Sequence, residues 1–353
     1  MFSERIKRLT PYVPGEQPQD RSYIKLNTNE NPYPPTPKIQ GLLGEFGLER
    51  LRLYPDPAAL RLRRAIGETC GLTKDEVFVS NGSDEALSFC FYAFFESGHG
   101  RLLFPEFTYS FFPVYCSFYD IQFERVPLAP DFSVDVEGFL HRGPSSCGLI
   151  LANPNAPTGI ALPLERIRFL LDHYPENKAV IVDEAYIDFG GESAARLIRD
   201  HPNLVVVRTF SKSLSLAGLR LGFVLAQKNL IDQLFTVKDA FNSYPCDTLS
   251  QTIGEMALSD QPYFQKVTAK IIATRDAFAS ALGKMGWQVL PSKANFVFAG
   301  KEGIPGEDIY AKLKERGILV RWFDTEGIRN FVRITIGTDD DMERFLLEAQ
   351  EAF

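Results

Sequence analysis

Short apolar runs recur along the first two thirds of this 353-residue chain, and helix-like stretches separate several of them. Such runs are typical of strands that are buried on both faces of a parallel sheet. Strands that alternate with helices indicate βαβ units with right-handed crossovers and helices on both faces of a mainly parallel sheet. We therefore predict the α/β class, with strands at 76–80, 101–105, 122–128, 148–152, 179–182 and 203–207 and helices at 58–70, 84–95 and 164–173.

The pattern changes after about residue 245, where a smaller α+β domain is expected. Its predicted elements are helices at 262–284, 307–316 and from 339, and strands at 287–290, 295–298, 318–322 and 331–336. The first 37 residues are rich in Pro, Asn and Tyr, which favours an extended arm that is ordered against another part of the protein. The predicted organisation is an arm at 1–37, a large domain at 38–245 and a small domain at 246–353.

Composition argues against several classes of function. The net charge is −7 and Lys and Arg form no run, so nucleic acid is not expected as the main partner. The longest dense apolar stretch, near 86–95, is far shorter than the roughly 20 residues of a membrane helix, and the N-terminus has no apolar leader. Four scattered histidines favour no metal site. Five cysteines without a CxxC pair fit reduced thiols and a cytoplasmic location.

Lys212 follows the predicted strand at 203–207 and is flanked by Ser211 and Ser213. Arg220 comes eight residues later, in Gly-Leu-Arg-Leu-Gly. Burial and a neighbouring positive charge both lower the pKa of an amine and make it a better nucleophile. A single lysine in a turn is more often an exposed loop residue, because lysine is rarely buried. The other motifs must therefore decide whether this lysine is catalytic.

The segment 80–85, Ser-Asn-Gly-Ser-Asp-Glu, joins a predicted strand to a predicted helix. Ser83 suits a helix N-cap, and Asp84 and Glu85 suit the first turn, so a well-capped helix explains the segment. The free backbone N–H groups at a helix start can also bind a phosphate. The two carboxylates oppose that second interpretation unless they point away, so that only the amides and Ser83 face the anion.

Two further strand ends carry polar residues. The segment 152–159, Ala-Asn-Pro-Asn-Ala-Pro-Thr-Gly, has more asparagines than its turn requires, and the next strand ends at Asp183. Ligands of open α/β sheets bind at the carboxyl ends of strands, so these side chains are site candidates. A buried carboxylate must be paired or bind a cation, and Mg²⁺ is a rival ligand for Asp183. The chain has neither a GxxxxGK[ST] phosphate loop nor a GxGxxG fingerprint to accompany it.

Together these residues describe one ligand. It would carry a carbonyl for the amine of Lys212, a protonatable ring nitrogen for Asp183, and a phosphate for Ser83, Ser211 and Arg220. Pyridoxal 5′-phosphate has all three groups, and we predict it as the cofactor.

The same motifs resemble a known family. Asn-Pro-Asn-Ala-Pro-Thr-Gly, Val-Asp-Glu-Ala-Tyr and Arg-Thr-Phe-Ser-Lys-Ser with Ala-Gly-Leu-Arg-Leu-Gly resemble the fold-type I aminotransferases, whose large domain has the aspartate-aminotransferase fold. Leu-Thr-Pro-Tyr, Leu-Asn-Thr-Asn-Glu-Asn-Pro and Arg-Ile-Thr-Ile-Gly-Thr are similar to the histidinol-phosphate aminotransferases within that superfamily. The resemblance spans the chain from Leu9 to Gly337.

This resemblance implies an activity and a catalytic set. The reaction would convert imidazole-acetol phosphate and L-glutamate to L-histidinol phosphate and 2-oxoglutarate, in histidine biosynthesis. Lys212 would bind the cofactor covalently and carry a proton, Asp183 would pair with the ring nitrogen, and Tyr186 would bond the phenolate oxygen. The residues implied to hold the cofactor are Gly82, Ser83, Asp84, Tyr109, Asn155, Asp183, Tyr186, Thr209, Ser211, Lys212, Arg220 and Tyr54.

Substrate contacts and assembly are implied in the same way. Arg333 would bind the acidic end of either substrate, because the planar fork of an arginine accepts a phosphate or a carboxylate. Tyr54 would reach the cofactor phosphate from the partner subunit, which implies a homodimer with shared active sites and an arm that packs on the small domain and the partner. The residues implied to bind substrate are Tyr12, Asn29, Arg321 and Arg333.

Two positions depart from the family pattern. Ala156 stands where many members have an asparagine that bonds the phenolate oxygen, so either Asn155 takes over or Tyr186 and water suffice. Phe112 replaces a frequent tyrosine. An aromatic amino-acid aminotransferase and a phospho-threonine decarboxylase stay open as alternatives. A regulator that binds the cofactor without turnover usually has a DNA-binding domain ahead of it, whereas only the arm of about 37 residues precedes the predicted large domain here.

Overall fold

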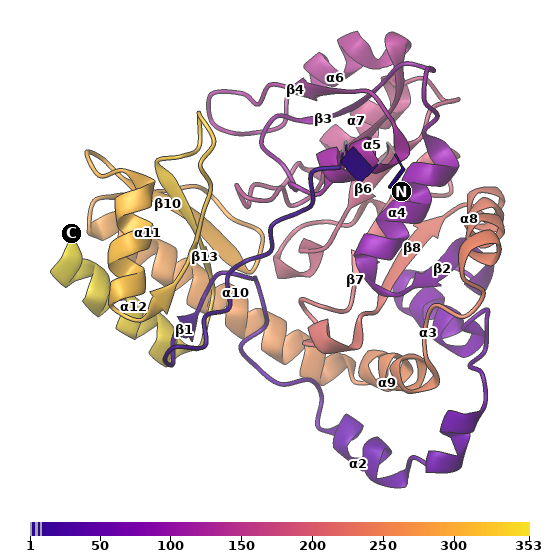
Figure 1. Ribbon diagram of the computed structural model, residues 1–353, viewed down its shortest axis with the longest axis horizontal. Coiled ribbons are helices and arrows are strands. Elements are labelled where there is room, and N and C mark those ends of the chain that lie inside the picture. Colours follow the sequence, from indigo (N-terminus) through magenta and orange to yellow (C-terminus); the bar gives the residue numbers. More distant parts are fainter. Residues whose placement is uncertain (1, 4–5, 8) are drawn as a thin grey trace.

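A seven-stranded sheet forms the centre of the larger of two bodies in the computed structural model, which describes residues 2–3, 6–7 and 9–353 (Figure 1). β8 runs antiparallel to both of its neighbours, and the other neighbouring pairs are parallel. The strands lie in the order β2 (Val77–Ser80), β8 (Gly222–Ala226), β7 (Leu204–Thr209), β6 (Val180–Asp183), β5 (Ser146–Ala152), β3 (Arg101–Pro105) and β4 (Phe123–Val126). The predicted α/β class with a mainly parallel sheet is confirmed.

Helices cover both faces of this sheet, because successive residues of each buried strand point to opposite sides. Val205 and Val207 pack in one core, whereas Leu204 and Val206 pack in the other. One face carries α4 (Gly82–Phe94), α5 (Phe112–Tyr119) and α8 (Lys228–Phe241). The other face carries α3 (Leu60–Cys70), α6 (Val136–Arg142), α7 (Leu164–His173) and α9 (Thr248–Leu258).

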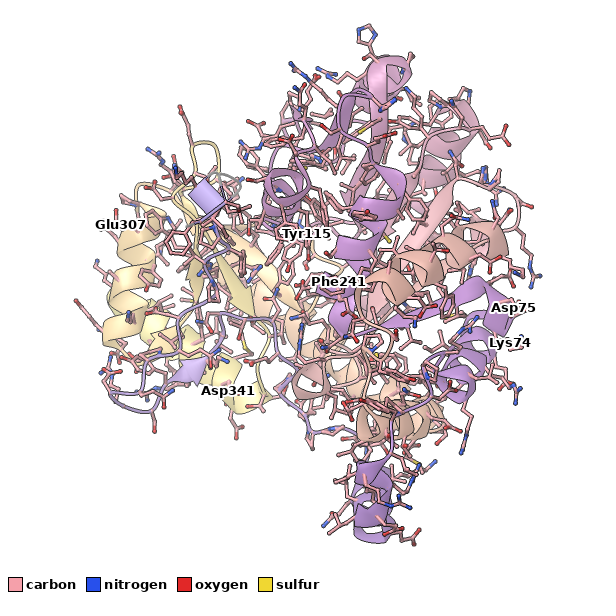
Figure 2. The ribbon with its side chains drawn as sticks, turned by 45° about the vertical axis from the view of Figure 1, so that its right-hand side comes forward. Lys74, Asp75, Tyr115, Phe241, Glu307 and Asp341 are labelled. Carbon is pink, nitrogen blue, oxygen red and sulfur yellow. The ribbon has the colours of Figure 1, made fainter. Side chains whose placement is uncertain are left out.

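The second body is built on a four-stranded antiparallel sheet with its own core. Its strands lie in the order β12 (Arg321–Trp322), β13 (Phe331–Thr335), β10 (Phe296–Lys301) and β9 (Trp287–Val289). Its helices are α10 (Gln261–Lys284), α11 (Gly306–Glu315) and α12 (Asp339–Ala352). The N-terminal segment reaches this body through β1 (Ile24–Lys25), which pairs in parallel with β11 (Ile318–Leu319). α2 (Lys38–Glu45) projects from the large body (Figures 1 and 2).

Most predicted elements match the structure closely, and three corrections are informative. α4 begins at Gly82, so Ser83 lies in its first turn and the prediction of Ser83 as the N-cap was wrong. The backbone N–H of Asn81 is instead bound by the carboxylate of Glu85, at 2.6 Å. β8 was missed because its apolar run follows a Gly-Leu-Arg-Leu-Gly sequence that we interpreted only as a loop. The short helix α5 and the longer helix α8 were also missed.

The boundary between the two bodies stays a prediction. α9 follows residue 245, yet Ile253 and Ala257 on this helix pack in the same core as α3 of the large body. Val267 and Ile271 on α10 pack in the core of the C-terminal body. We therefore propose that the change of domain falls between α9 and α10.

Gly222 provides a first test of this packing. A Cβ atom at this position would lie 2.3 Å from the backbone nitrogen of Ser83 and 2.4 Å from the carbonyl carbon of Gly82. Because these are backbone atoms of the α4 start, Gly222→Ala should lower the free energy of unfolding by at least about 2 kcal/mol in chemical denaturation. Gly218→Ala is the control, since its Cβ meets no atom within 4 Å. Equal stability of the two variants would contradict the close approach of β8 and α4.

Candidate active site

The sequence-predicted residues converge on one cavity of about 260 Å³. It lies where the ends of β5, β6 and β7 meet the start of α4, the N-terminal segment and the C-terminal sheet. Three predicted residues, Gly82, Asn155 and Tyr54, are not among its lining residues. The predicted residues that do line it are Tyr12, Asn29, Ser83, Asp84, Tyr109, Asp183, Tyr186, Thr209, Ser211, Lys212, Arg220, Arg321 and Arg333.

Lys212 projects its amine into this cavity from the turn after β7. Its Nζ donates a hydrogen bond to the carbonyl oxygen of Thr28 at 3.2 Å and lies 5.8 Å from the ring centre of Tyr186. Burial, and secondly the nearby guanidinium of Arg333, lower the pKa of this amine to about 8. A sizeable fraction of the amine is therefore neutral and nucleophilic near neutral pH. The sequence had pointed to Arg220 as the neighbouring cation, but its effect on Lys212 is smaller than that of Arg333.

Asp183 is the last residue of β6 and sits beside Ala152 of β5 and Val207 of β7 in the sheet register. Its side chain is only 6% exposed, and its Oδ1 accepts the backbone N–H of Ala185 at 3.1 Å. Burial raises the pKa of this carboxyl to about 7. A carboxylate in this position gains free energy from a cationic or N–H partner in the cavity.

The start of α4 forms a seat for an anion, opposite Arg220. Gly82 and Arg220 both adopt left-handed backbone, with φ of 84° and 52°. A Cβ at Gly82 would lie 2.8 Å from the guanidinium of Arg220, so a side chain there would collide with it. Glu85 turns back to Asn81, away from the cavity. Asp84 does not point away, which corrects the condition set from the sequence for a phosphate site: it lines the cavity, where Arg220 and the hydroxyl of Tyr109 donate to it at 3.1 and 3.0 Å.

Two arginines reach the opposite side of the cavity from the C-terminal sheet. Arg333 on β13 donates to the carbonyl of Asn27 at 3.1 Å, and its Nε is buried without a hydrogen-bond partner among the residues that the structure describes. Arg321 on β12 donates to the carbonyls of Val13 and Pro14, at 3.0 and 3.3 Å. The unpaired Nε of Arg333 can therefore donate to an oxyanion in the cavity.

Tyr186 and Asn29 are bonded to each other. Asn29 is 1% exposed and adopts left-handed backbone (φ 56°), which asparagine tolerates better than most residues. Its Nδ2 donates to the hydroxyl oxygen of Tyr186 at 2.8 Å, and its Oδ1 accepts the hydroxyl of Thr335 at 3.1 Å. Because the oxygen of Tyr186 accepts from Asn29, the Tyr186 proton is left to donate to another acceptor.

Aromatic rings close the cavity on the side of the N-terminal arm. Tyr12 packs against Phe111, with ring centres 5.0 Å apart, and lies 6.5 Å from Tyr109. Phe112, which replaces a tyrosine frequent in the family, is buried and meets Tyr109 edge-on at 5.6 Å. It therefore supports the ring of Tyr109 from within the core.

Asn155 and Ala156 answer one question that the sequence left open. The amide of Asn155 donates to the carbonyl of Phe107 at 2.8 Å and to the hydroxyl of Thr158 at 3.1 Å. Ala156, and not Asn155, lines the cavity. The donating Nδ2 of Asn155 is thus committed to Phe107 and Thr158, which favours Tyr186 as the donor at this side of the cavity.

Tyr54 lies apart from the cavity and is 82% exposed. Its ring stacks on Tyr244 with centres 4.7 Å apart. Both tyrosines line a hollow of about 490 Å³ that also includes Asn81 and Arg220. The hollow therefore meets the anion seat from the outer side.

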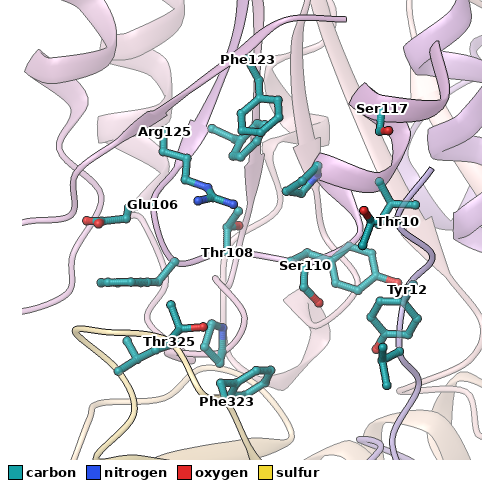
Figure 3. A pocket seen from close by; sticks show the side chains of 18 of the residues that line it. Thr10, Tyr12, Glu106, Thr108, Ser110, Ser117, Phe123, Arg125, Phe323 and Thr325 are labelled. Atoms are coloured by element: carbon teal, nitrogen blue, oxygen red, sulfur yellow. The ribbon is translucent and has the colours of Figure 1, made fainter. Parts of the chain in front are cut away.

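A larger hollow of about 720 Å³ adjoins the cavity and shares Tyr12, Tyr109 and Arg321 with it. Figure 3 shows its labelled lining, with Thr10 and Tyr12 on the N-terminal arm and Phe323 and Thr325 on the loop after β12. Its lining includes neither Lys212 nor Asp183, so we interpret it as a space beside the reactive groups.

Sequence reasoning missed several residues around Lys212. The carbonyl of Thr28 accepts a hydrogen bond from the Lys212 amine. Asn31 donates to the carbonyl of Lys212, and Asp188 accepts the hydroxyl of Ser213. The abundance of asparagine at 27–31 was visible, but nothing in the sequence indicated which group each amide binds.

Among the residues that the structure describes, no group of three or more His, Cys, Asp or Glu could hold a metal ion. Within the same residues, no helix is long and apolar enough to cross a membrane.

Asp183 gives a pH-dependent prediction. Its carboxyl holds a proton up to about pH 7 when folded, whereas an unfolded aspartic acid loses it near pH 4, so the stability of the cofactor-free protein should fall as the pH rises between these values. Asp183→Asn removes this penalty and should raise the free energy of unfolding by roughly 4 kcal/mol at pH 8 and by little at pH 4. Asp200→Asn, at an exposed site, is the control. A loss of stability at pH 8 in thermal denaturation of Asp183→Asn would contradict the assigned pKa.

Comparison with known proteins places this geometry in a family. The family model described as aminotransferase class I and II matches residues 21–348. A curated histidinol-phosphate aminotransferase from Syntrophus aciditrophicus is 58% identical over 100% of this chain and 98% of its own length. One from Chromohalobacter salexigens is 48% identical over 99% of this chain and 98% of its own length.

A solved structure has the same fold. The crystal structure of histidinol-phosphate aminotransferase from Sinorhizobium meliloti in complex with pyridoxal-5′-phosphate matches with a TM-score of 0.90 and 25% identity, and the match covers 99% of this chain and 97% of that chain. With a family model over most of its length and close relatives over all of it, the chain belongs to the class I and II aminotransferases.

Proposed function

We propose that this aminotransferase transfers an amino group between L-glutamate and imidazole-acetol phosphate, which yields L-histidinol phosphate and 2-oxoglutarate in histidine biosynthesis. The proposal rests on the residues that line one cavity. An amine of lowered pKa, a strand-end carboxylate and an arginine with an unpaired buried Nε line the same space: Lys212, Asp183 and Arg333. Relatives that are up to 58% identical are named histidinol-phosphate aminotransferase, which supports histidinol phosphate as one of the substrates.

The lining fits pyridoxal 5′-phosphate as cofactor. Close approach of Gly82 to Arg220 and of Gly222 to Ser83 leaves a seat that only glycines permit, next to backbone N–H groups at a helix start. Ser83, Ser211 and Arg220 would hold the phosphate there, and Tyr109 would stack on the ring. When bound, this cofactor supplies an aldehyde carbon for the amine and a ring that accepts electrons from the substrate.

Lys212 would perform the covalent and proton-transfer steps. Its Nζ, neutral in a sizeable fraction near neutral pH, would hold the cofactor covalently through the aldehyde carbon, with release of water. When not bonded to the cofactor, the same Nζ would take a proton from one carbon and return it to the other. Its contact with the carbonyl of Thr28 gives the displaced amine a hydrogen-bond acceptor.

Asp183 and Tyr186 would hold the ring of the cofactor. As an anion, Asp183 would accept the N–H of the ring nitrogen and keep that nitrogen protonated. The hydroxyl of Tyr186 would donate to the phenolate oxygen, because Asn29 already occupies its acceptor side. Tyr186 would then bond the phenolate oxygen alone, whereas many family members also use an asparagine at the position of Ala156.

Arg333 and Arg321 would bind the acidic end of both substrates. One site serves a phosphate and a carboxylate because the guanidinium donates two parallel N–H groups to either anion. Tyr12, on the arm that Arg321 binds through Val13 and Pro14, would cover the same end. This arrangement excludes water from the reacting carbon while leaving one anion site for two substrates.

The substrate assignment has a direct test. Purified protein titrated with L-histidinol phosphate should show conversion of the visible absorbance of the lysine-bound cofactor, with kcat/KM at least about a hundredfold above that for phenylalanine. Faster conversion by phenylalanine would overturn the substrate assignment and keep the aminotransferase class. Release of CO₂ from phospho-threonine would identify a decarboxylase. Absence of a visible absorbance band with Lys212 intact would reject the whole scheme.

We also propose a homodimer with shared active sites, in the cytoplasm. The projecting segment around α2 exposes a series of large apolar side chains, as expected of a surface that a second copy covers. These are Leu43, Leu48, Leu51, Leu53 and Tyr54. Five free cysteine thiols support the location, and a net charge of −7 gives no support for nucleic acid as a partner.

Mixing two inactive variants tests the shared site. Tyr54→Ala and Lys212→Ala would be combined after separate purification, at a cofactor concentration that leaves Tyr54→Ala inactive. If Tyr54 acts on the partner's cofactor, each mixed dimer regains one complete site, and random exchange should restore about a quarter of wild-type activity. If Tyr54 serves its own chain through the hollow that it shares with Arg220, mixing restores nothing. Gel filtration of each variant checks that both remain dimers.

A further inference from the structure

The main chain that follows Lys212 is held from two sides by residues outside the cavity. On one side, Nδ2 of Asn31 donates to the carbonyls of Lys212 and Ser213, at 3.0 and 3.3 Å. On the other, the hydroxyl of Ser213, a residue that is 4% exposed, donates to Oδ2 of Asp188 at 2.5 Å. Neither Asn31 nor Asp188 lines the cavity, so the reaction as described so far uses neither.

Asp188 is itself fixed to the rigid part of the fold. Its Oδ1 accepts a charge-assisted hydrogen bond from Arg208, which stands on β7 between β6 and β8. The guanidinium of Arg208 also lies 4.0 Å from the buried carboxylate of Glu184. Glu184 accepts the hydroxyl of Ser193 and the backbone N–H of Ala194, both at 2.6 Å. Charged groups bonded in this way lock each other's orientation.

We propose that Asn31 and Asp188 form a clamp that fixes the main chain of Lys212 while its side chain moves. This inference rests on the proposed role of Lys212, whose amine must reach two different atoms in one cycle. The long lysine side chain can return to both atoms only if its Cα stays in place. A misplacement of about 1 Å can slow an enzyme about a hundredfold. Asn31, Asp188 and Ser213 are therefore positioning residues.

A purely structural role is the competing explanation, since buried hydrogen bonds also stabilise folds. The test compares Ser213→Ala, which cuts the link to Asp188, with Ser193→Ala, which removes a hydroxyl from the same charged network without touching the lysine loop. Asn31→Ala releases the other side of the clamp and replaces Ser213→Ala as the test variant if Ser213→Ala does not fold. Lys212→Ala reports separately on the proposed function.

Three readouts decide between the explanations. Relative to Ser193→Ala, Ser213→Ala should lose about tenfold in kcat with KM for L-histidinol phosphate unchanged within about twofold. Peptides covering 210–216 should exchange amide hydrogens faster in the cofactor-free protein, because the N–H of Ser215 is bonded to the carbonyl of Lys212. The pH at which the lysine-bound cofactor changes colour should also shift.

A kcat for both Ser213→Ala and Asn31→Ala within twofold of Ser193→Ala would overturn the clamp, whatever the change in melting temperature. An equal loss in Ser193→Ala would also overturn it, since the effect would then belong to the charged network as a whole. If Lys212→Ala keeps the visible band and the activity, the proposed function fails instead. These results are distinguishable because each variant breaks one link.

Discussion

Desolvation of charged groups at one edge of the large sheet is the constraint on which the rest of the structure depends. Lys212, Asp183 and Arg333 all lose hydration in the same cavity, and burial is the largest cause of the pKa shift of each. Favourable interactions elsewhere in the fold must offset this unfavourable free energy. Here they come from two apolar cores on either side of a sheet whose central strands are buried on both faces. The same desolvation makes the amine nucleophilic, so reactivity and packing have a common origin.

Strand ends were the part of the site that the sequence could predict. An apolar run followed by a polar residue identifies both a buried strand and a side chain near its carboxyl end. Asp183 and Lys212 were found in this way. Contacts between distant segments could not be predicted, because a hydrogen-bond partner leaves no local pattern. The bond from Asn29 to Tyr186 spans 157 residues, and the commitment of Asn155 to Phe107 depends on the path of a loop. Ser83 was misplaced at the cap because the helix begins one residue before it, at Gly82, after an N-cap residue, Asn81, that makes no side-chain cap hydrogen bond.

The C-terminal sheet and the N-terminal arm act as one unit at the cavity. Arg321 binds the arm through the carbonyls of Val13 and Pro14, and Glu16 binds Lys314 and Tyr310 on α11. Asn29 joins the same unit through Thr335 on β13. In the proposed function, the large sheet would provide the reactive amine and the anion seat, and the other unit would provide the groups that select the substrate. This proposed division would allow one cofactor site to serve substrates as different as an imidazole phosphate and an amino acid.

The pairing of β1 with β11 has a consequence for synthesis of the protein. Ile24 and Lys25 find their strand partners at Ile318 and Leu319, so this pairing cannot form until residue 319 has left the ribosome. Contacts between residues so far apart in sequence are also slow to form. Lys212 and Asp183 can be assembled in the large sheet well before that moment. A partly made chain that ends before β11 would therefore hold the reactive amine without the arm that covers it.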